Sequence, residues 1–179
     1  FFFSSISIHV TDSLKNFVAS ARGSIGIATA CASVMILLTT RSVTLTVLSA
    51  ISIGYVFVST IACLVGLGWT LGVFESILLA VSVGIGSDYV LHVSHSYSTA
   101  PDSVVTREER TRYALAHIGR SIIGSAFTTI STALMMMIAE NQFSRKFATL
   151  LIVTIFQALI GSFVVFVVLC DCFGPSIKS

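Results

Sequence analysis

An acidic residue deep inside an apolar run is the residue in this sequence best suited to do chemistry. Asp88 stands in the run from 71 to 97, among mostly apolar and small neighbours. A charged side chain at the centre of a bilayer costs roughly 2.5–3.5 kcal/mol on insertion scales. A low dielectric favours the neutral acid, so such a group can exchange a proton near physiological pH, or hold Na⁺ where other oxygens converge. The alternative is a structural acid that is paired within a helix bundle.

Three further residues are expected on the same helical face as this carboxylate. At about 100° per residue, one sector of about 80° contains Gly84, Asp88, His92 and His95. Gly84 lies one turn before Asp88 and leaves space beside it. His92 and His95 either extend a proton relay or lie at the membrane interface.

A second polar line follows in a later apolar run. Hydroxyl residues recur there at helical spacing, namely Ser121, Ser125, Thr128 and Thr132, with Thr129 beside them. These side chains could line an ion path that faces Asp88, and Ser125, Thr128 and Thr129 are the candidates. Ordinary hydrogen bonding between helices, worth about 0.6 kcal/mol each, is the alternative.

Resident metals and cofactors are not predicted. Asp88 with His92 and His95 could ligate a metal, but the sequence has no HExxH motif. The remaining histidines, His9 and His117, are too far apart in the sequence to complete a His-rich site.

The composition indicates the environment of these residues. Hydrophobic residues make up 55% of the 179 residues and charged residues 10%, and the mean hydropathy is +0.97. Soluble domains carry about 25% charged residues, and disordered chains need low hydrophobicity. A membrane protein, or a piece of one, is therefore expected. The net charge of +2 gives no indication of a nucleic-acid partner.

Five apolar runs can be counted, at 23–40, 42–65, 71–97, 120–139 and 147–170. A helix needs about 20 residues to cross a bilayer, and a spanning segment must satisfy its own backbone hydrogen bonds. The runs predict an all-α membrane protein with a bundle of five transmembrane helices over 23–172. Frequent small residues within the runs favour close helix packing.

The flanking segments predict the remaining organisation. Residues 1–22 begin strand-like and continue with amphipathic spacing, as expected for the end of an extracytoplasmic domain and a lead-in helix at the membrane surface. The chain starts with Phe1, so we expect a fragment whose N-terminal part is missing. Arginines cluster between 98 and 120, which by the positive-inside rule places that loop and the tail at 173–179 in the cytoplasm.

Several motifs, taken in order, resemble one known family. The segment Gly84-Ile-Gly-Ser-Asp88 resembles the Gxxx(D/E) signature of the resistance–nodulation–division (RND) superfamily, in its Patched and Dispatched branch. The segments 71–75, 113–121 and 126–129 are similar to Dispatched proteins, and Phe173-Gly-Pro175 is similar to Patched. The resemblance covers nearly the whole chain.

The resemblance implies a fold and a function. Family members have twelve spans and two large extracytoplasmic domains, so this chain would supply spans eight to twelve, the pseudo-repeat of the sterol-sensing domain. Asp88 would be the tenth-span acid and Gly84 its glycine. In the family this acid works opposite acids of the fourth span to pass protons or Na⁺, a flux thought to drive movement of sterols, lipids or lipid-modified proteins. The fourth-span partner is absent from this chain.

Two functional hypotheses follow from the resemblance. The first is the C-terminal transmembrane half of a proton- or Na⁺-coupled transporter, with membrane lipids or sterol, the driving ion and the N-terminal half of the permease as partners. The second is a sterol-responsive membrane receptor or scaffold without flux. Both place a multi-pass, non-enzymatic protein in the plasma membrane or an endomembrane, with the C-terminus in the cytoplasm.

Overall fold

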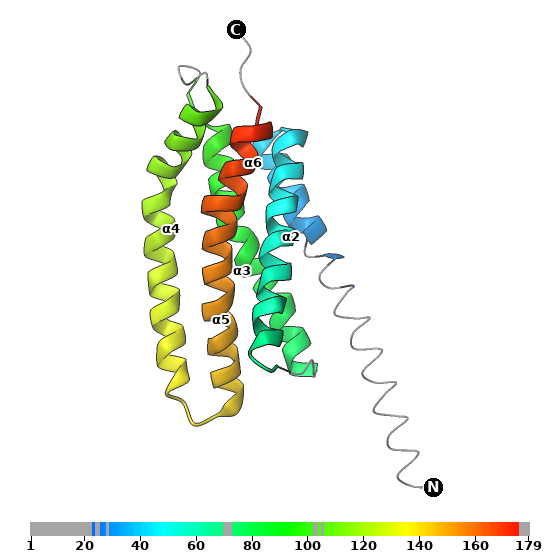
Figure 1. Ribbon diagram of the computed structural model, residues 1–179, viewed down its shortest axis with the longest axis vertical. Coiled ribbons are helices and arrows are strands. Elements are labelled where there is room, and N and C mark those ends of the chain that lie inside the picture. Colours follow the sequence, from blue (N-terminus) through cyan, green and yellow to red (C-terminus); the bar gives the residue numbers. More distant parts are fainter. Residues whose placement is uncertain are drawn as a thin grey trace, which may run out of the picture.

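The structure, a computed structural model, is a bundle of helices (Figure 1). It describes residues 23, 26–27, 29–69, 73–101, 104 and 106–175, with side chains omitted at 73–76. The described ranges contain helices and no strand, which confirms the all-α prediction. The strand-like start and the lead-in helix expected at 1–22 lie outside these ranges, as do residues 176–179.

The elements follow one another with short connections. They are α2 (Val43–Gly66), α3 (Val73–Ser98), α4 (Arg107–Met137), α5 (Gln142–Ile160), the π-helix η1 (Gly161–Val165) and α6 (Phe166–Phe173). A shorter apolar helix, Thr29–Thr40, precedes α2. The segments α5, η1 and α6 form one continuous rod (Figure 1).

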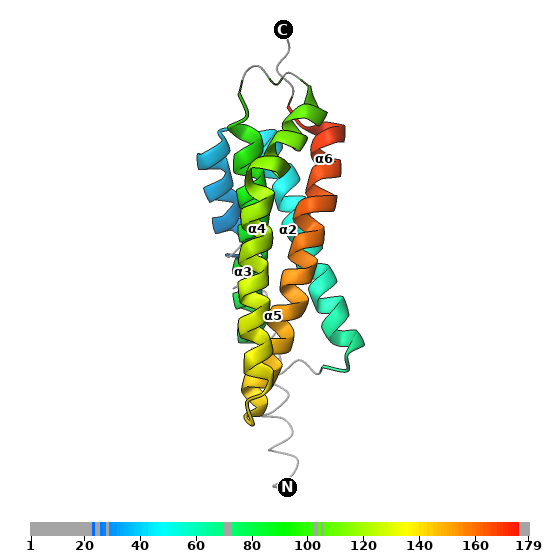
Figure 2. The ribbon, with the colours of Figure 1, turned by 90° about the vertical axis from the view of Figure 1, so that its left-hand side faces the viewer.

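The long helices pack side by side along the bundle axis. Helix α4 packs against α3 and α5, and α2 packs against the same two helices from another side. In Figure 2 the bundle is narrow, with α4 in front of α3 and beside α5. At one end α2 begins, α3 ends, α4 begins and α6 ends, and we call this the Arg-rich end. At the other end α2 ends and α3 begins, and a short turn connects α4 with α5 (Figure 1).

Three helical stretches are long and apolar enough to cross a membrane, namely Val43–Gly66, Ile77–Ser98 and Gln142–Phe173. Two of the five expected spans are not among them. In the first run the described apolar helix is limited to Thr29–Thr40, and Ser and Thr residues lower the hydropathy of α4. Helix α4 nevertheless runs beside the other helices along the bundle (Figure 1).

Polar capping explains why α4 begins at Arg107, well before the apolar run at 120. The Thr106 hydroxyl accepts a hydrogen bond from the Glu109 amide, and the Glu109 carboxylate accepts one from the Thr106 amide, at 3.2 and 3.3 Å. This capping box satisfies two amides that the helix cannot pair by itself. The charged first turns of α4 are therefore helical although they are not apolar.

The end of α2 is set by a glycine. Gly68 has a φ of 77°, which only glycine adopts without strain. The Trp69 amide then donates to the Leu64 carbonyl at 3.1 Å, and the Gly68 amide to Val65 at 2.9 Å. This Schellman arrangement satisfies carbonyls at the helix end and turns the chain toward α3.

Buried hydroxyl groups join the helices inside the bundle. The Ser49 hydroxyl on α2 donates to the Ser94 hydroxyl on α3 at 3.1 Å, and the Ser52 hydroxyl donates to the Gly161 carbonyl of η1 at 2.7 Å. These four residues are at least nine-tenths buried. Since lipid offers no competing water, such bonds and close packing replace the hydrophobic effect as the source of association between helices.

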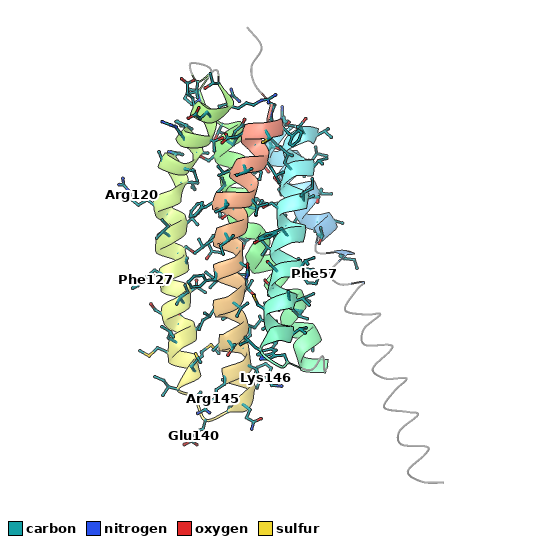
Figure 3. All side chains as sticks on the ribbon, in the orientation of Figure 1. Phe57, Arg120, Phe127, Glu140, Arg145 and Lys146 are labelled. Atoms are coloured by element: carbon teal, nitrogen blue, oxygen red, sulfur yellow. The ribbon has the colours of Figure 1, made fainter. Side chains whose placement is uncertain are left out.

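A cation–π contact joins the two turns opposite the Arg-rich end. The Lys146 ammonium lies 5.8 Å from the ring centroid of Trp69, and Figure 3 shows Lys146 near the turn at this end. Trp69 also packs with Phe147 against a cluster that contains Leu64 and Leu150. The contact fixes the start of α5 against the turn that follows α2.

Candidate functional site

A groove between α3 and α4 forms a cavity in the described part of the chain. Its volume is about 390 Å³, and both helices contribute polar and apolar side chains to its walls. The lining residues are Ile85, Asp88, Tyr89, His92, Ile118, Ser121, Ile122, Ser125 and Thr129. The carboxylate that the sequence singles out therefore lies in a cavity with polar walls.

The polar face of α3 points out of the bundle. Four residues on this face are exposed in the chain, namely Gly84, Asp88, His92 and His95. The opposite side of α3 supplies core residues such as Val90 and Val93, which are 0% and 1% exposed. The packing of α3 on α2 and α5 thus directs Asp88 away from these two helices.

Close packing on the inner face explains this rotation of α3. A Cβ on Gly86 would lie 3.0 Å from Val56 Cγ1 of α2 and 3.8 Å from Thr154 Cγ2 of α5. A Cβ on Gly84, two residues earlier, would have no heavy atom within 4 Å. Gly86 therefore permits the contact of α3 with α2, whereas a Cβ at Gly84 would touch no other described part of the bundle.

The Asp88 carboxylate has no hydrogen bond and no salt bridge with any residue that the structure describes. His92, one turn later on α3, lines the same groove. Tyr89 of α3 and Ser125 of α4 add hydroxyl groups to its two walls. Asp88 is thus available to a ligand or to a partner outside this chain.

Three threonines of the predicted polar line on α4 donate within their own helix. Thr128 and Thr129 both donate to the Ser125 carbonyl, at 2.8 and 2.9 Å, and Thr132 donates to the Thr128 carbonyl at 3.0 Å. The proton of each hydroxyl is therefore directed to the backbone, and the oxygen lone pairs face outward. Bonds from these hydroxyls to another helix, the ordinary alternative for this polar line, do not occur among the described residues.

The structure brings together some of the residues that the sequence proposes for the site. Asp88, His92, Ser125 and Thr129 line the groove. Thr128 and His95 are exposed but do not line it.

Sequence reasoning assigned no role to Tyr89, although it directly follows Asp88. Ser121 belongs to the predicted polar line but was not selected as a candidate, and the structure places it in the groove wall. No group of three or more His, Cys, Asp or Glu side chains in the described part of the chain could hold a metal ion.

The arrangement can bind a small cation or a proton. A carboxylate without a hydrogen bond or salt bridge to the described residues provides the charge, and hydroxyl oxygens with outward lone pairs provide neutral ligands of the kind that hard cations prefer.

Comparison with known proteins identifies relatives that match most of this chain. The chain is 33% identical to protein dispatched homolog 1 of Homo sapiens over 152 residues, and 31% identical to its Mus musculus counterpart over 150 residues. Each match covers 84% of this chain and 10% of the relative. The chain is also 35% identical to protein dispatched homolog 3 of Homo sapiens over 72 residues.

These matches include much of the described bundle, but they cover a small part of the relatives. The chain spans about one tenth of the length of the dispatched homolog 1 proteins it matches. No model of a known protein family matches the chain. The similarity over 84% of the chain, the apolar helices and the motif around Asp88 agree with one another, and the chain is therefore a Dispatched-like member of the Patched and Dispatched branch of the RND superfamily.

Proposed function

We propose that this bundle is the C-terminal transmembrane half of an ion-coupled RND-type transporter. Asp88 binds and releases the driving ion, a proton or Na⁺, and Gly84 leaves room beside it. The cargo is a sterol, a lipid or a lipid-modified protein. The observation that carries the proposal is the position of Asp88 on the exposed face of α3, in a groove with hydroxyl-bearing walls and without a hydrogen bond or salt bridge to any residue that the structure describes.

The cost of a membrane carboxylate supports this role. If the exposed face met lipid, Asp88 would cost roughly 2.5–3.5 kcal/mol on insertion scales. A second bundle that covers the face, as spans from the other half of such a permease would, removes most of this cost by supplying polar partners or water. The empty space beside Gly84 is suited to the close approach of another helix.

The charge state of Asp88 then controls how the two bundles pack. A negative Asp88 without an ion favours an arrangement that brings water or a cation to the groove. A protonated or Na⁺-bound Asp88 permits closer apolar packing. An ion gradient can thus bias a two-state equilibrium, as alternating access requires.

The polar residues of the groove walls have different roles in this proposal. Ser125 and Thr129 supply oxygens on the α4 side, and His92 lies one turn from Asp88 toward the Arg-rich end. His95 and Thr128 would border the same path outside the groove. No step of this binding cycle makes or breaks a covalent bond other than that to a proton, so we propose no enzymatic activity and no resident cofactor.

Arginine placement supports one orientation in the membrane. Arg41, Arg107, Arg110 and Arg112 lie at the Arg-rich end. The positive-inside rule places this end, and with it the C-terminus, in the cytoplasm of a plasma membrane or endomembrane.

The experiment that tests the proposal is export of a lipid-modified reporter protein from cells that depend on this protein for release. Asp88→Asn replaces the carboxylate by an amide of the same shape. We expect surface delivery of the variant to be normal and export to fall to the level of cells without the protein. Collapse of the ion gradient should have the same effect on the natural protein.

Glu140→Gln is the matched control, because it makes the same chemical change in the exposed turn between α4 and α5 (Figure 3). Export should be unchanged in this variant. If Asp88→Asn also exports normally, the transporter proposal is wrong. A protein that still binds sterol and signals would then be a sterol-responsive receptor or scaffold.

A further inference from the structure

The last membrane helix contains an irregular turn that α2 holds in place. Residues Gly161–Val165 form a π-helix between α5 and α6. The Gly161 carbonyl accepts a hydrogen bond from the Phe166 amide, five residues later, and a second one from the Ser52 hydroxyl at 2.7 Å. In a regular α-helix this carbonyl would accept from the amide of residue 165. The bond from Ser52 therefore stabilises a carbonyl in its π-helical position.

Packing adds to this effect of α2. A Cβ at Gly161 would overlap a methyl group of Val56, one turn after Ser52. Gly161 and Ser162 are buried, while Val164 on the other side is 55% exposed. The buried side of the π-helical turn thus faces α2, and its exposed side faces away from the bundle.

Three polar contacts hold the other end of α6, and we call them the α6 clamp. The Thr111 hydroxyl shares its one proton between the Asp171 carboxylate at 2.7 Å and the Arg107 carbonyl of its own helix at 2.9 Å. The Arg107 guanidinium donates to the Cys172 carbonyl at 2.9 Å, where the partial negative charge of the helix end favours a cation.

The third contact of the clamp comes from α3. The Tyr97 hydroxyl donates to the Pro175 carbonyl at 3.4 Å, and a Cβ on Gly174 would lie 2.6 Å from that hydroxyl oxygen. Tyr97 is 1% exposed. Segments of α3, α4 and α6 that are far apart in the sequence therefore meet at the Arg-rich end.

Between the π-helical turn and the clamp, α6 has only eight residues. Two of its side chains, Phe166 and Cys170, are buried, at 1% exposed each. Conversion of the π-turn into an α-turn would rotate α6 by about 100° and shift it by about 1.5 Å. Such a rotation carries Asp171 away from Thr111 and Cys170 out of the core, so the two arrangements exclude each other.

We propose that α6 is a two-position swivel, with η1 as its pivot and the α6 clamp as its lock. The position described here is the locked one, in which Ser52 stabilises the π-turn. In the released position the turn is α-helical, the clamp is broken and Cys170 is accessible. The swivel depends on no property of the groove at Asp88, so it stands or fails independently of ion coupling.

The two cysteines of α6 provide a natural reporter, because Cys170 is buried and Cys172 is exposed. We would measure alkylation of Cys170 by N-ethylmaleimide in the full chain in lipid nanodiscs, by peptide mass spectrometry. A Cys172→Ser background leaves one cysteine in that segment and keeps the carbonyl that Arg107 binds. The alkylation rate reports the population of the released position when opening is fast.

Two substitutions should raise this rate from opposite ends of α6. Ser52→Ala removes the bond to the π-turn, and we expect an increase of about fivefold, as for the loss of one net hydrogen bond. Thr111→Val removes the bond to a carboxylate, and we expect an increase of about tenfold. Ser59→Ala and Thr149→Val are matched controls, because both hydroxyls donate within their own helices, at 3.0 and 2.9 Å, and neither should change the rate.

Deletion of Val164 removes the one extra residue that the π-turn holds, so the turn becomes α-helical without rotation of α6 and should keep α6 in the locked position. Cys170 should then react no faster than it does in the Cys172→Ser background. If the deletion prevents folding, Ser52→Ala and Thr111→Val decide the matter, with folding checked by thermal unfolding of the helical signal. An unchanged Cys170 rate in both folded variants would overturn the swivel.

Discussion

Val56 of α2 fills the space that Gly161 of η1 leaves by having no side chain, since a Cβ at Gly161 would overlap a Val56 methyl group. Val56 also faces Gly86 of α3, where a Cβ would lie 3.0 Å from its Cγ1. One β-branched side chain on α2 thus packs against glycines of two other helices. A β-branched residue has little rotamer freedom in a helix, so it cannot move away easily.

Gly161→Ala should therefore destabilise the bundle. We expect a loss of about 1–3 kcal/mol in the free energy of unfolding, as for overpacking of a dense core. The measurement is equilibrium unfolding in mixed micelles, followed by loss of helical signal. Gly84→Ala is the control, because a Cβ there has no heavy atom within 4 Å and should change stability by no more than about 1 kcal/mol. Equal effects of the two substitutions would contradict this packing.

The capping box at the start of α4 should contribute measurably to the free energy of unfolding. Thr106→Ala removes the acceptor for the Glu109 amide, and we expect a loss of about 1 kcal/mol. Hydrogen exchange should accelerate in the first turn of α4 and not beyond it. Thr132→Ala removes a hydroxyl that bonds only within its helix and serves as the comparison. Unchanged exchange near Thr106 would show that the cap contributes nothing.

A larger side chain beside Asp88 should reduce transport without changing the stability of this chain. A Cβ at Gly84 would have no heavy atom within 4 Å, so we expect Gly84→Leu to show normal unfolding and surface delivery. If a second bundle packs against this face, the larger side chain costs roughly 1–3 kcal/mol at that contact and export should fall by tenfold or more. Gly54→Leu places the same side chain on α2, where a Cβ also has no heavy atom within 4 Å, and should export normally. Normal export by Gly84→Leu would argue against a partner at this face.

The hydroxyl wall of the groove should tune ion affinity. The double substitution Ser125→Ala and Thr129→Val removes two oxygens that line the groove with Asp88 and keeps its apolar walls. Because hard cations prefer oxygen ligands, we expect the Na⁺ concentration for half-maximal export to rise severalfold, while the dependence on a proton gradient stays the same. If neither the Na⁺ dependence nor the proton-gradient dependence of export changes, these hydroxyls do not contribute to the ion path.

The helical face of Asp88 could be predicted because the spacing of Gly84, Asp88, His92 and His95 is a local property of one helix. The structure places all four on the exposed side of α3. The choice between neighbouring hydroxyls depends on how α4 is rotated against α3. Thr129 lines the groove and Thr128 does not. The sequence supplies only their depth along the helix, which is nearly the same for both residues.

The π-turn and the α6 clamp could not be predicted from the sequence. The five residues of η1 have the composition of an ordinary apolar helix. Their irregular turn depends on Ser52, which is 109 positions away from Gly161. Asp171 ends the last apolar run, and its partner Thr111 is 60 positions away. Such contacts arise only when the helices are packed.

The most direct test of the account is ion flux through the intact protein in proteoliposomes, with and without the Asp88 carboxylate. A ²²Na⁺ or pH gradient across the vesicle membrane should drive uptake above the level of empty vesicles. Asp88→Asn should reduce uptake to that level, while Glu140→Gln should match the natural protein. Equal uptake by the natural protein and Asp88→Asn would contradict the claim that this carboxylate couples an ion gradient to transport.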